Sequence, residues 1–299
     1  MRKVFKILRN VFAIIGVIAV LLYACIRVCK LQVSVKESVA GHRDNYIDSL
    51  KTSGAYAKDT LSFHIAAVPD SARAAEIRSY FQLDTLYDAS ASTWDKTLAI
   101  AKFVADNIPH GNQTVQPEKR NAIYLWEYTK TVEPAFNCRL HSIMMFELLS
   151  SVGLAATFVT CMPQDRYDND CHVVNQVWLP ELGKWAMIDS DSGGNYATDA
   201  DGNVLSLQEI REHYISGEAI NYHPGFGKAA GKNSWYYAYM AKNTYWFSCW
   251  ENIRYDQEPI SNNDNPGREI FLAPAGFETF NVYDTDLVTS DADKFWAEP

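Results

Sequence analysis

One cysteine of this sequence stands where a thiol could act as a nucleophile. Cys138 opens the stretch CRLHSIMMFELLSS, whose apolar residues recur at helical spacing until Gly153. The positive end of a helix dipole favours the thiolate, which attacks carbonyl carbon far better than a thiol does. The pattern therefore predicts a helix whose first residue is a candidate nucleophile.

A nucleophilic thiol needs a base and a group that orients this base. His172 opens the strand-like run HVVNQVWL, and Asp189 closes the run KWAMID, with the turn PELG between them. A hairpin centred near Leu182 would pair His172 with Asp189 on adjacent strands. We expect the helix from Cys138 to pack on that same face of the sheet. These residues would then form a triad of thiol, imidazole and carboxylate.

Neighbouring residues carry weaker signals. Asp191, just past the strand end, could compete with Asp189 for the orienting role. His141, one turn after Cys138, is interpreted as a helix-surface residue, although it could tune the thiolate or bind substrate. No CxxC or HxxxH spacing accompanies these residues, so we predict neither a metal site nor a cofactor.

The elements around the triad indicate helices packed on an antiparallel sheet, an α+β fold. Three short strand-like runs follow one another with short connections, which favours antiparallel pairing. Asp201-Gly202 predicts a hairpin turn, and Ser206 with Glu209 has the spacing of a capping box. The predicted helices are 70–83, 93–108, 121–133, the run from 138 to Gly153, and 206–217; the predicted strands are 154–161, 171–179 and 184–189.

This order of features resembles the transglutaminase-like superfamily, whose fold is papain-like. The matching features are Cys138 at a helix start, the turn Gly153-Leu154 into a strand, His172 opening the next strand, and the strand end Trp185-Ala-Met-Ile-Asp189. They extend over roughly residues 93–192, about a third of the chain. Several ordered elements make a more specific match than a lone cysteine or histidine.

The resemblance implies a reaction and a role for each residue. Cys138 would attack an amide carbonyl and form a thioester, with His172 as base and then acid and Asp189 as its orienting residue. The main-chain N–H of Cys138 would donate to the oxyanion. Water as acceptor would make a peptidase or amidase, and an amine would make a crosslinking enzyme. The candidates for a second oxyanion donor are Asn112, Gln113 and Trp126.

The N-terminus predicts a membrane or signal segment. A basic flank at 1–10 precedes the uncharged run VFAIIGVIAVLLYACI, and we assign 11–29 to the segment. It could be an uncleaved anchor, a signal cleaved after Ala24, or a lipoprotein leader with Cys25. Each alternative places the body outside the cytoplasm, in the periplasm or at the cell surface. In that oxidising setting Cys161 and Cys171 could form a disulfide.

Charge and composition narrow the partners. Residues 1–30 hold six Lys and Arg, whereas the remaining 269 residues carry 21 basic and 36 acidic groups, a net charge of −15. An acidic body repels the phosphate backbone, so nucleic acid is excluded as a partner. Beyond the N-terminal segment we divide the chain into a stalk at 30–69, a core at 70–260 and C-terminal edge strands and loops at 261–299.

These inferences together predict thiol-dependent acyl transfer or amide hydrolysis at the cell envelope. The expected partners are a peptide or protein amide substrate and a membrane at the N-terminal helix, and the oligomeric state is not determined. One alternative is a cell-wall peptide hydrolase of another papain-like family. The other is a catalytically inactive binding or scaffold module, which a buried Cys138 or an Asp189 turned away from His172 would favour.

Overall fold

A mixed six-stranded sheet forms the centre of the protein. The computed structural model describes the chain except residues 1, 192–194 and 258–266. The strand order is β10-β9-β7-β2-β3-β4. The predicted antiparallel pairing is confirmed from β9 to β4, but β10 runs parallel to β9. The strands are β2 (Ala156–Met162), β3 (His172–Leu179), β4 (Lys184–Ile188), β7 (Trp246–Trp250), β9 (Glu269–Leu272) and β10 (Leu287–Thr289).

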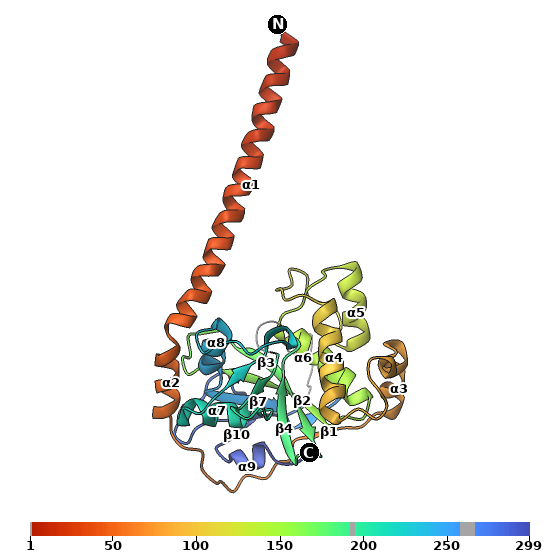
Figure 1. Cartoon of the computed structure of the whole chain (residues 1–299), viewed down its shortest axis with the longest axis vertical. Helices are drawn as coiled ribbons and strands as arrows, with labels where there is room; N and C mark the ends of the chain where they lie inside the picture. Colours follow the sequence, from red (N-terminus) through yellow and green to blue (C-terminus); the bar gives the residue numbers. More distant parts are fainter. Residues whose placement is uncertain (1, 192–194, 258–266) are drawn as a thin grey trace.

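Helices cover both faces of this sheet (Figure 1). One group consists of α3 (Ser71–Tyr80), α4 (Thr93–Asn107), α5 (Ala122–Thr131) and α6 (Cys138–Ser151). The other group consists of α2 (Arg43–Thr52), α7 (Leu207–Ser216) and α8 (Trp235–Asn243). Smaller elements are η1 (Leu83–Thr85), η2 (Pro224–Phe226), α9 (Ala292–Phe295), and the strands β1 (Ala66–Ala67), β5 (Ala197–Thr198), β6 (Asn221–Tyr222) and β8 (Asn252–Ile253).

The predicted helices begin where their capping residues stand. The Asp70 carboxylate accepts from two backbone N–H groups at the start of α3, and the Ser92 hydroxyl accepts from one at the start of α4. Ser206 and Glu209 form both hydrogen bonds of a capping box at α7. Each cap satisfies donors that the first helical turn leaves without a partner, so local sequence determines these boundaries.

Two apolar cores lie on opposite faces of the sheet. Val173 and Val177 of β3 pack in the core that contains the apolar residues of α6, whereas Val174 packs in the core that contains Tyr236 of α8. His172 shares a face with Val174, since side chains alternate along a strand. The expectation that α6 packs on the face of His172 is therefore wrong, because α6 covers the other face.

The hairpin of β3 and β4 has a different register from the predicted one. Asn175 pairs with Ile188, and Trp178 pairs with Trp185. Continued in this register, position 172 would lie opposite position 191, so the predicted pairing is wrong by two residues. An error of two leaves every side chain on its predicted face, because the side-chain period of a strand is two. Asp189 consequently stays on the face of His172.

The turn at Asp201-Gly202 is present, but the strand pairing around it is not a simple hairpin. The Asp199 carboxylate accepts hydrogen bonds from the N–H groups of Asp201 and Asn203. Thr198 and Val204 form an isolated bridge across the turn, while β5 pairs with β6 as a separate two-stranded sheet. The turn is held by hydrogen bonds between near neighbours, whereas the strand that pairs with β5 is β6, which follows α7 in the chain.

The segment predicted as a stalk packs partly on the body. The helix α1 runs from Arg2 to Gly41, and α2 follows it directly. Leu50 of α2 is fully buried in the core beside α7 and α8, and β1 pairs with β8. In the part of the chain that the structure describes, no helix is both long and apolar enough to cross a membrane. The structure thus does not support the membrane segment predicted at 11–29, and the location outside the cytoplasm stays a prediction.

Candidate active site

Cys138 is the first residue of α6. The side chain of Asn137 caps this helix by accepting a hydrogen bond from the N–H of Leu140, at 3.1 Å. The thiol is half-buried, whereas Cys161 and Cys249 are buried. The N–H of Cys138 belongs to the first turn, whose N–H groups find no carbonyl within the helix. The local sequence thus places a partly accessible thiol at the positive end of a helix.

His172 and Asp189 form a buried pair. The Nε2 atom of His172 lies 2.8 Å from Oδ2 of Asp189, and the side chains are 4% and 1% exposed. Burial by itself would lower the pKa of His172, but the charge of Asp189 and hydrogen bonds with Asp189 and Cys138 raise it well above its ordinary value. Burial likewise opposes ionisation of Asp189, yet the charge of His172 keeps the pKa of that carboxyl below its usual range. The pair is an imidazolium–carboxylate pair.

The thiol reaches the imidazole although α6 and the His172 side chain lie on opposite faces of the sheet. His172 is the first residue of β3, so its ring stands at the end of the sheet, where the two faces meet. Cys138 Sγ, a ring nitrogen of His172 and a carboxylate oxygen of Asp191 all lie within 4.8 Å of one another. Because Nε2 of His172 faces Asp189, its Nδ1 is the nitrogen left for the thiol.

Tyr236 completes the surroundings of the pair and was missed by sequence reasoning. Its buried hydroxyl donates to Oδ2 of Asp189 at 2.6 Å and lies 3.5 Å from Nε2 of His172. The ring of Tyr239 contacts the His172 ring edge to face at 5.2 Å between centroids. Both tyrosines belong to the aromatic-rich start of α8, a pattern that core packing explains equally well, so the composition carried no signal for this role.

Asp191 orients His110 and not His172. Its two carboxylate oxygens lie 2.9 and 3.1 Å from Nδ1 of His110, and its N–H donates to Oδ1 of Asp189 at 2.9 Å. His141 is 1% exposed, so the expectation of a surface residue is wrong; its Nε2 lies 3.6 Å from Asp191. Burial lowers the pKa of His141. No sequence spacing links 110 to 191, so only the fold could reveal this pair.

Several secondary expectations are corrected. The Gln113 amide donates to the carbonyl oxygens of Gly111 and Ala135, both at 2.8 Å, so it is engaged in holding the backbone. The Trp126 ring stacks on Phe103 at 5.5 Å between centroids and packs against the core. Neither arrangement supports a role as oxyanion donor. Cys161 and Cys171 are free thiols, which contradicts the suggested disulfide.

The cluster of Cys138, His172 and Asp191 also contains ligand types that zinc accepts. Among the residues that the structure describes, these three form the group whose donor atoms lie close enough together to bind one metal ion. The two ligands Cys138 and His172 have an alternative use as a nucleophile and its base. The prediction that the reaction needs no metal stays a prediction.

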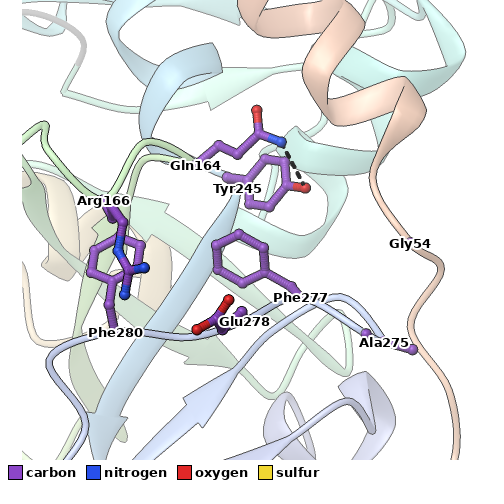
Figure 2. Close-up of a pocket in the computed structure, with 9 residues that line it drawn as sticks. Gly54, Gln164, Arg166, Tyr245, Ala275, Phe277, Glu278 and Phe280 are labelled. Carbon is purple, nitrogen blue, oxygen red and sulfur yellow. Dashed lines mark hydrogen bonds between the residues drawn. The ribbon is translucent and has the colours of Figure 1, made fainter.

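A cavity of about 410 Å³ lies elsewhere in the molecule (Figure 2). Its lining includes Gln164, whose amide donates to the Tyr245 hydroxyl at 3.3 Å, and Arg166, whose guanidinium lies over the Phe280 ring. In the lining that the structure describes, none of the predicted triad residues takes part. The cavity is therefore separate from the candidate active site.

Comparison with known proteins gives a family match for the centre of the chain. Residues 81–190 match the model of the transglutaminase-like superfamily. No curated protein matches the sequence.

Two solved structures are similar over part of the chain. A candidate cysteine protease from Cytophaga hutchinsonii shares 15% identity over 55% of this chain and 50% of that chain, with a TM-score of 0.33. A candidate protease from Parabacteroides distasonis shares 13% identity over 45% of this chain and 30% of that chain, with a TM-score of 0.27. The aligned part of this chain thus spans half or less of the length of each of these two solved proteins. The segment 81–190, which contributes the thiol, the imidazole and the Asp189 carboxylate, is similar to the transglutaminase-like superfamily.

Proposed function

We propose that this protein is a cysteine acyltransferase or hydrolase that acts on amide bonds of peptides or proteins. The observation that carries the proposal is the arrangement of three groups. Cys138 opens a helix, its Sγ lies within 4.8 Å of a ring nitrogen of His172, and Oδ2 of Asp189 lies 2.8 Å from Nε2 of His172. The family match over 81–190 supports the same class of chemistry.

Each residue has one role in the proposed reaction. The Cys138 thiolate forms a bond to the acyl carbon, and the Cys138 N–H donates to the developing oxyanion. His172 gives its proton to the leaving amine as the bond between carbon and nitrogen breaks. Asp189 keeps the imidazole in the required tautomer and stabilises its charged form. Water or an amine then attacks the thioester, and the thiolate leaves.

The proposal predicts that Cys138 is more reactive than the other cysteines of the folded body. The full-length protein is treated with iodoacetamide at neutral pH, and alkylation is followed site by site by mass spectrometry. We expect Cys138 to react at least ten times faster than Cys161, Cys171 and Cys249, because burial raises the pKa of these three thiols. His172→Ala removes the charge partner of the thiolate, so alkylation of Cys138 should fall about tenfold or more.

The thiols of Cys161, Cys171 and Cys249 serve as internal controls in both proteins. If His172→Ala leaves the rate at Cys138 unchanged while the controls also react as before, no thiolate–imidazolium pair exists. An inactive binding module would then be the better account of the fold. A general loss of protection at Cys161 and Cys249 would instead show that the substitution had unfolded the protein, and His172→Gln would replace it.

A further inference from the structure

A second histidine–carboxylate pair stands beside the thiol. Nδ1 of His110 lies 2.9 and 3.1 Å from the two carboxylate oxygens of Asp191. A carboxylate oxygen of Asp191 lies within 4.8 Å of Cys138 Sγ and of a His172 ring nitrogen. The pair of His172 and Asp189 already serves the thiol. The second pair therefore borders the thiol through its carboxylate.

The backbone holds His110 next to the start of α6. The N–H of Phe136 donates to the carbonyl of Pro109 at 3.0 Å, and the N–H of Gly111 donates to the carbonyl of Phe136 at 2.8 Å. These bonds attach the segment around His110 to the residue two positions before Cys138. The placement thus follows from main-chain pairing as well as from the side-chain contact with Asp191.

The two members of the second pair differ in exposure. The His110 side chain is 49% exposed, whereas the Asp191 side chain is 2% exposed. Nδ1 of His110 faces the carboxylate, so Nε2 is the nitrogen available to a molecule arriving from solvent. The hydrogen bond with Asp191 raises the pKa of His110, so its neutral imidazole is a stronger base than an ordinary histidine, with Nε2 as the atom that exchanges the proton.

We propose that His110 is a second catalytic base, which takes the proton of the acyl acceptor, and that Asp191 is its positioning residue. This inference rests on the proposed function, since it needs a thioester at Cys138. It assigns the two histidines to different half-reactions: His172 protonates the leaving amine during acylation, and His110 deprotonates the incoming acceptor during deacylation.

The step balances with the groups at the site. The acceptor oxygen or nitrogen forms a bond to the acyl carbon, its proton passes to Nε2 of His110, and the bond between carbon and Sγ breaks to leave the Cys138 thiolate. After acylation His172 is neutral, and after deacylation His110 carries the proton of the acceptor. Transfer of that proton through solvent to His172 restores the starting thiolate and imidazolium. No oxidant, reductant or metal takes part.

The two half-reactions can be measured apart with p-nitrophenyl acetate. Release of p-nitrophenolate reports acylation, and loss of the acetyl mass from the peptide containing Cys138 reports deacylation by water. We expect His110→Ala to slow deacylation about tenfold or more and to leave acylation within about twofold, because a general base typically contributes at least that factor. Asp191→Asn should slow deacylation by a smaller factor.

Two further variants separate catalysis from structure. His110→Asn keeps a donor for the Asp191 carboxylate but has no basic nitrogen. It should deacylate as slowly as His110→Ala, and free imidazole in the buffer should restore the rate of His110→Ala. His64→Ala is the matched control, since His64 is an exposed histidine for which the structure gives no hydrogen bond; its rates should equal those of the wild type.

Each outcome has a single meaning. If wild-type Cys138 is never acetylated, the proposed function fails and the role of His110 fails with it. If acylation is normal but His110→Ala deacylates like the wild type, the inference alone is overturned. The inference would also be overturned if His110→Asn deacylated at the wild-type rate while His110→Ala deacylated slowly. The histidine would then be needed only for its hydrogen bond with Asp191.

Discussion

At the scale of single residues, the site depends on how each buried charge is compensated. Asp189 is 1% exposed, and its carboxylate accepts from His172, from the Tyr236 hydroxyl and from the N–H of Asp191. A buried carboxylate is tolerated only with such partners, since loss of one leaves an acceptor that water cannot reach. The orientation of His172 therefore depends on residues outside the predicted triad.

Tyr236→Phe tests this dependence directly. The substitution removes a donor at 2.6 Å from a charged acceptor while keeping the ring. We expect a loss of about 1–3 kcal/mol in the free energy of unfolding, because hydrogen bonds to charged groups contribute about that much. Acetylation of Cys138 should slow severalfold as Asp189 loses its fixed position.

The matched control for this variant is Tyr167→Phe. Tyr167 is 86% exposed, so removal of its hydroxyl should change neither urea unfolding nor acetylation. Equal effects of the two substitutions would mean that the Tyr236 hydroxyl does not support Asp189.

At the scale of elements, the start of α6 connects helix stability with thiol chemistry. Asn137 caps the helix, and Cys138 is the next residue. Asn137→Ala should cost about 1 kcal/mol of stability, which is typical for the loss of an N-cap. The midpoint of urea unfolding should fall accordingly. The first turn of α6 should also fray more often, so alkylation of Cys138 should be slower than in the wild type.

Asn121→Ala is a control of the same residue type and the same role. Asn121 caps α5, where its side chain accepts from the N–H of Tyr124 at 2.9 Å. A similar loss of stability is expected without slower alkylation of Cys138. If both substitutions slowed alkylation of Cys138 equally, the effect would come from global stability and not from the N-terminus of α6.

At the scale of the whole molecule, one buried carboxyl joins parts of the chain that are far apart in sequence. Glu147 of α6 is 1% exposed and accepts from the N–H of Ala122 at 2.7 Å and from the N–H of Asp256 at 2.9 Å. Burial, opposed by these hydrogen bonds, raises the pKa of Glu147 to about 7. The folded protein therefore binds this proton more tightly than the unfolded chain does.

This shift predicts the direction of a pH dependence. The stabilising contribution of the proton is fully present below the ordinary pKa near 4.5 and is lost as the pH rises to about 7. The free energy of unfolding should fall by about 3 kcal/mol across that window from this group alone. Glu147→Gln cannot ionise, so its stability should lack this component of the decline, although the amide loses one accepted hydrogen bond.

Urea unfolding of the wild type and Glu147→Gln at a series of pH values between 4.5 and 8 measures the difference. Glu118→Gln, at an exposed position, should follow the wild-type curve. Parallel curves for the wild type and Glu147→Gln would contradict the prediction, because they would show that Glu147 titrates alike in the folded and unfolded states.

Features that depend on near neighbours could be predicted from the sequence alone. The caps at Asp70, Ser92 and Ser206 satisfy donors two or three residues away, so the helix starts could be predicted from local patterns. The same face for His172 and Asp189 followed from the period of two along a strand. That inference survived an error of two residues in register, because such an error does not change the face.

The contacts between distant segments, in contrast, became visible only in the folded molecule. The register of β3 and β4, the packing of α6 on the face opposite His172, and the pair of His110 and Asp191 all depend on packing between segments far apart in sequence. Tyr236 reaches Asp189 for the same reason. Spacing along the chain carries no signal for such contacts, since the free energy that selects them comes from burial of both cores at once.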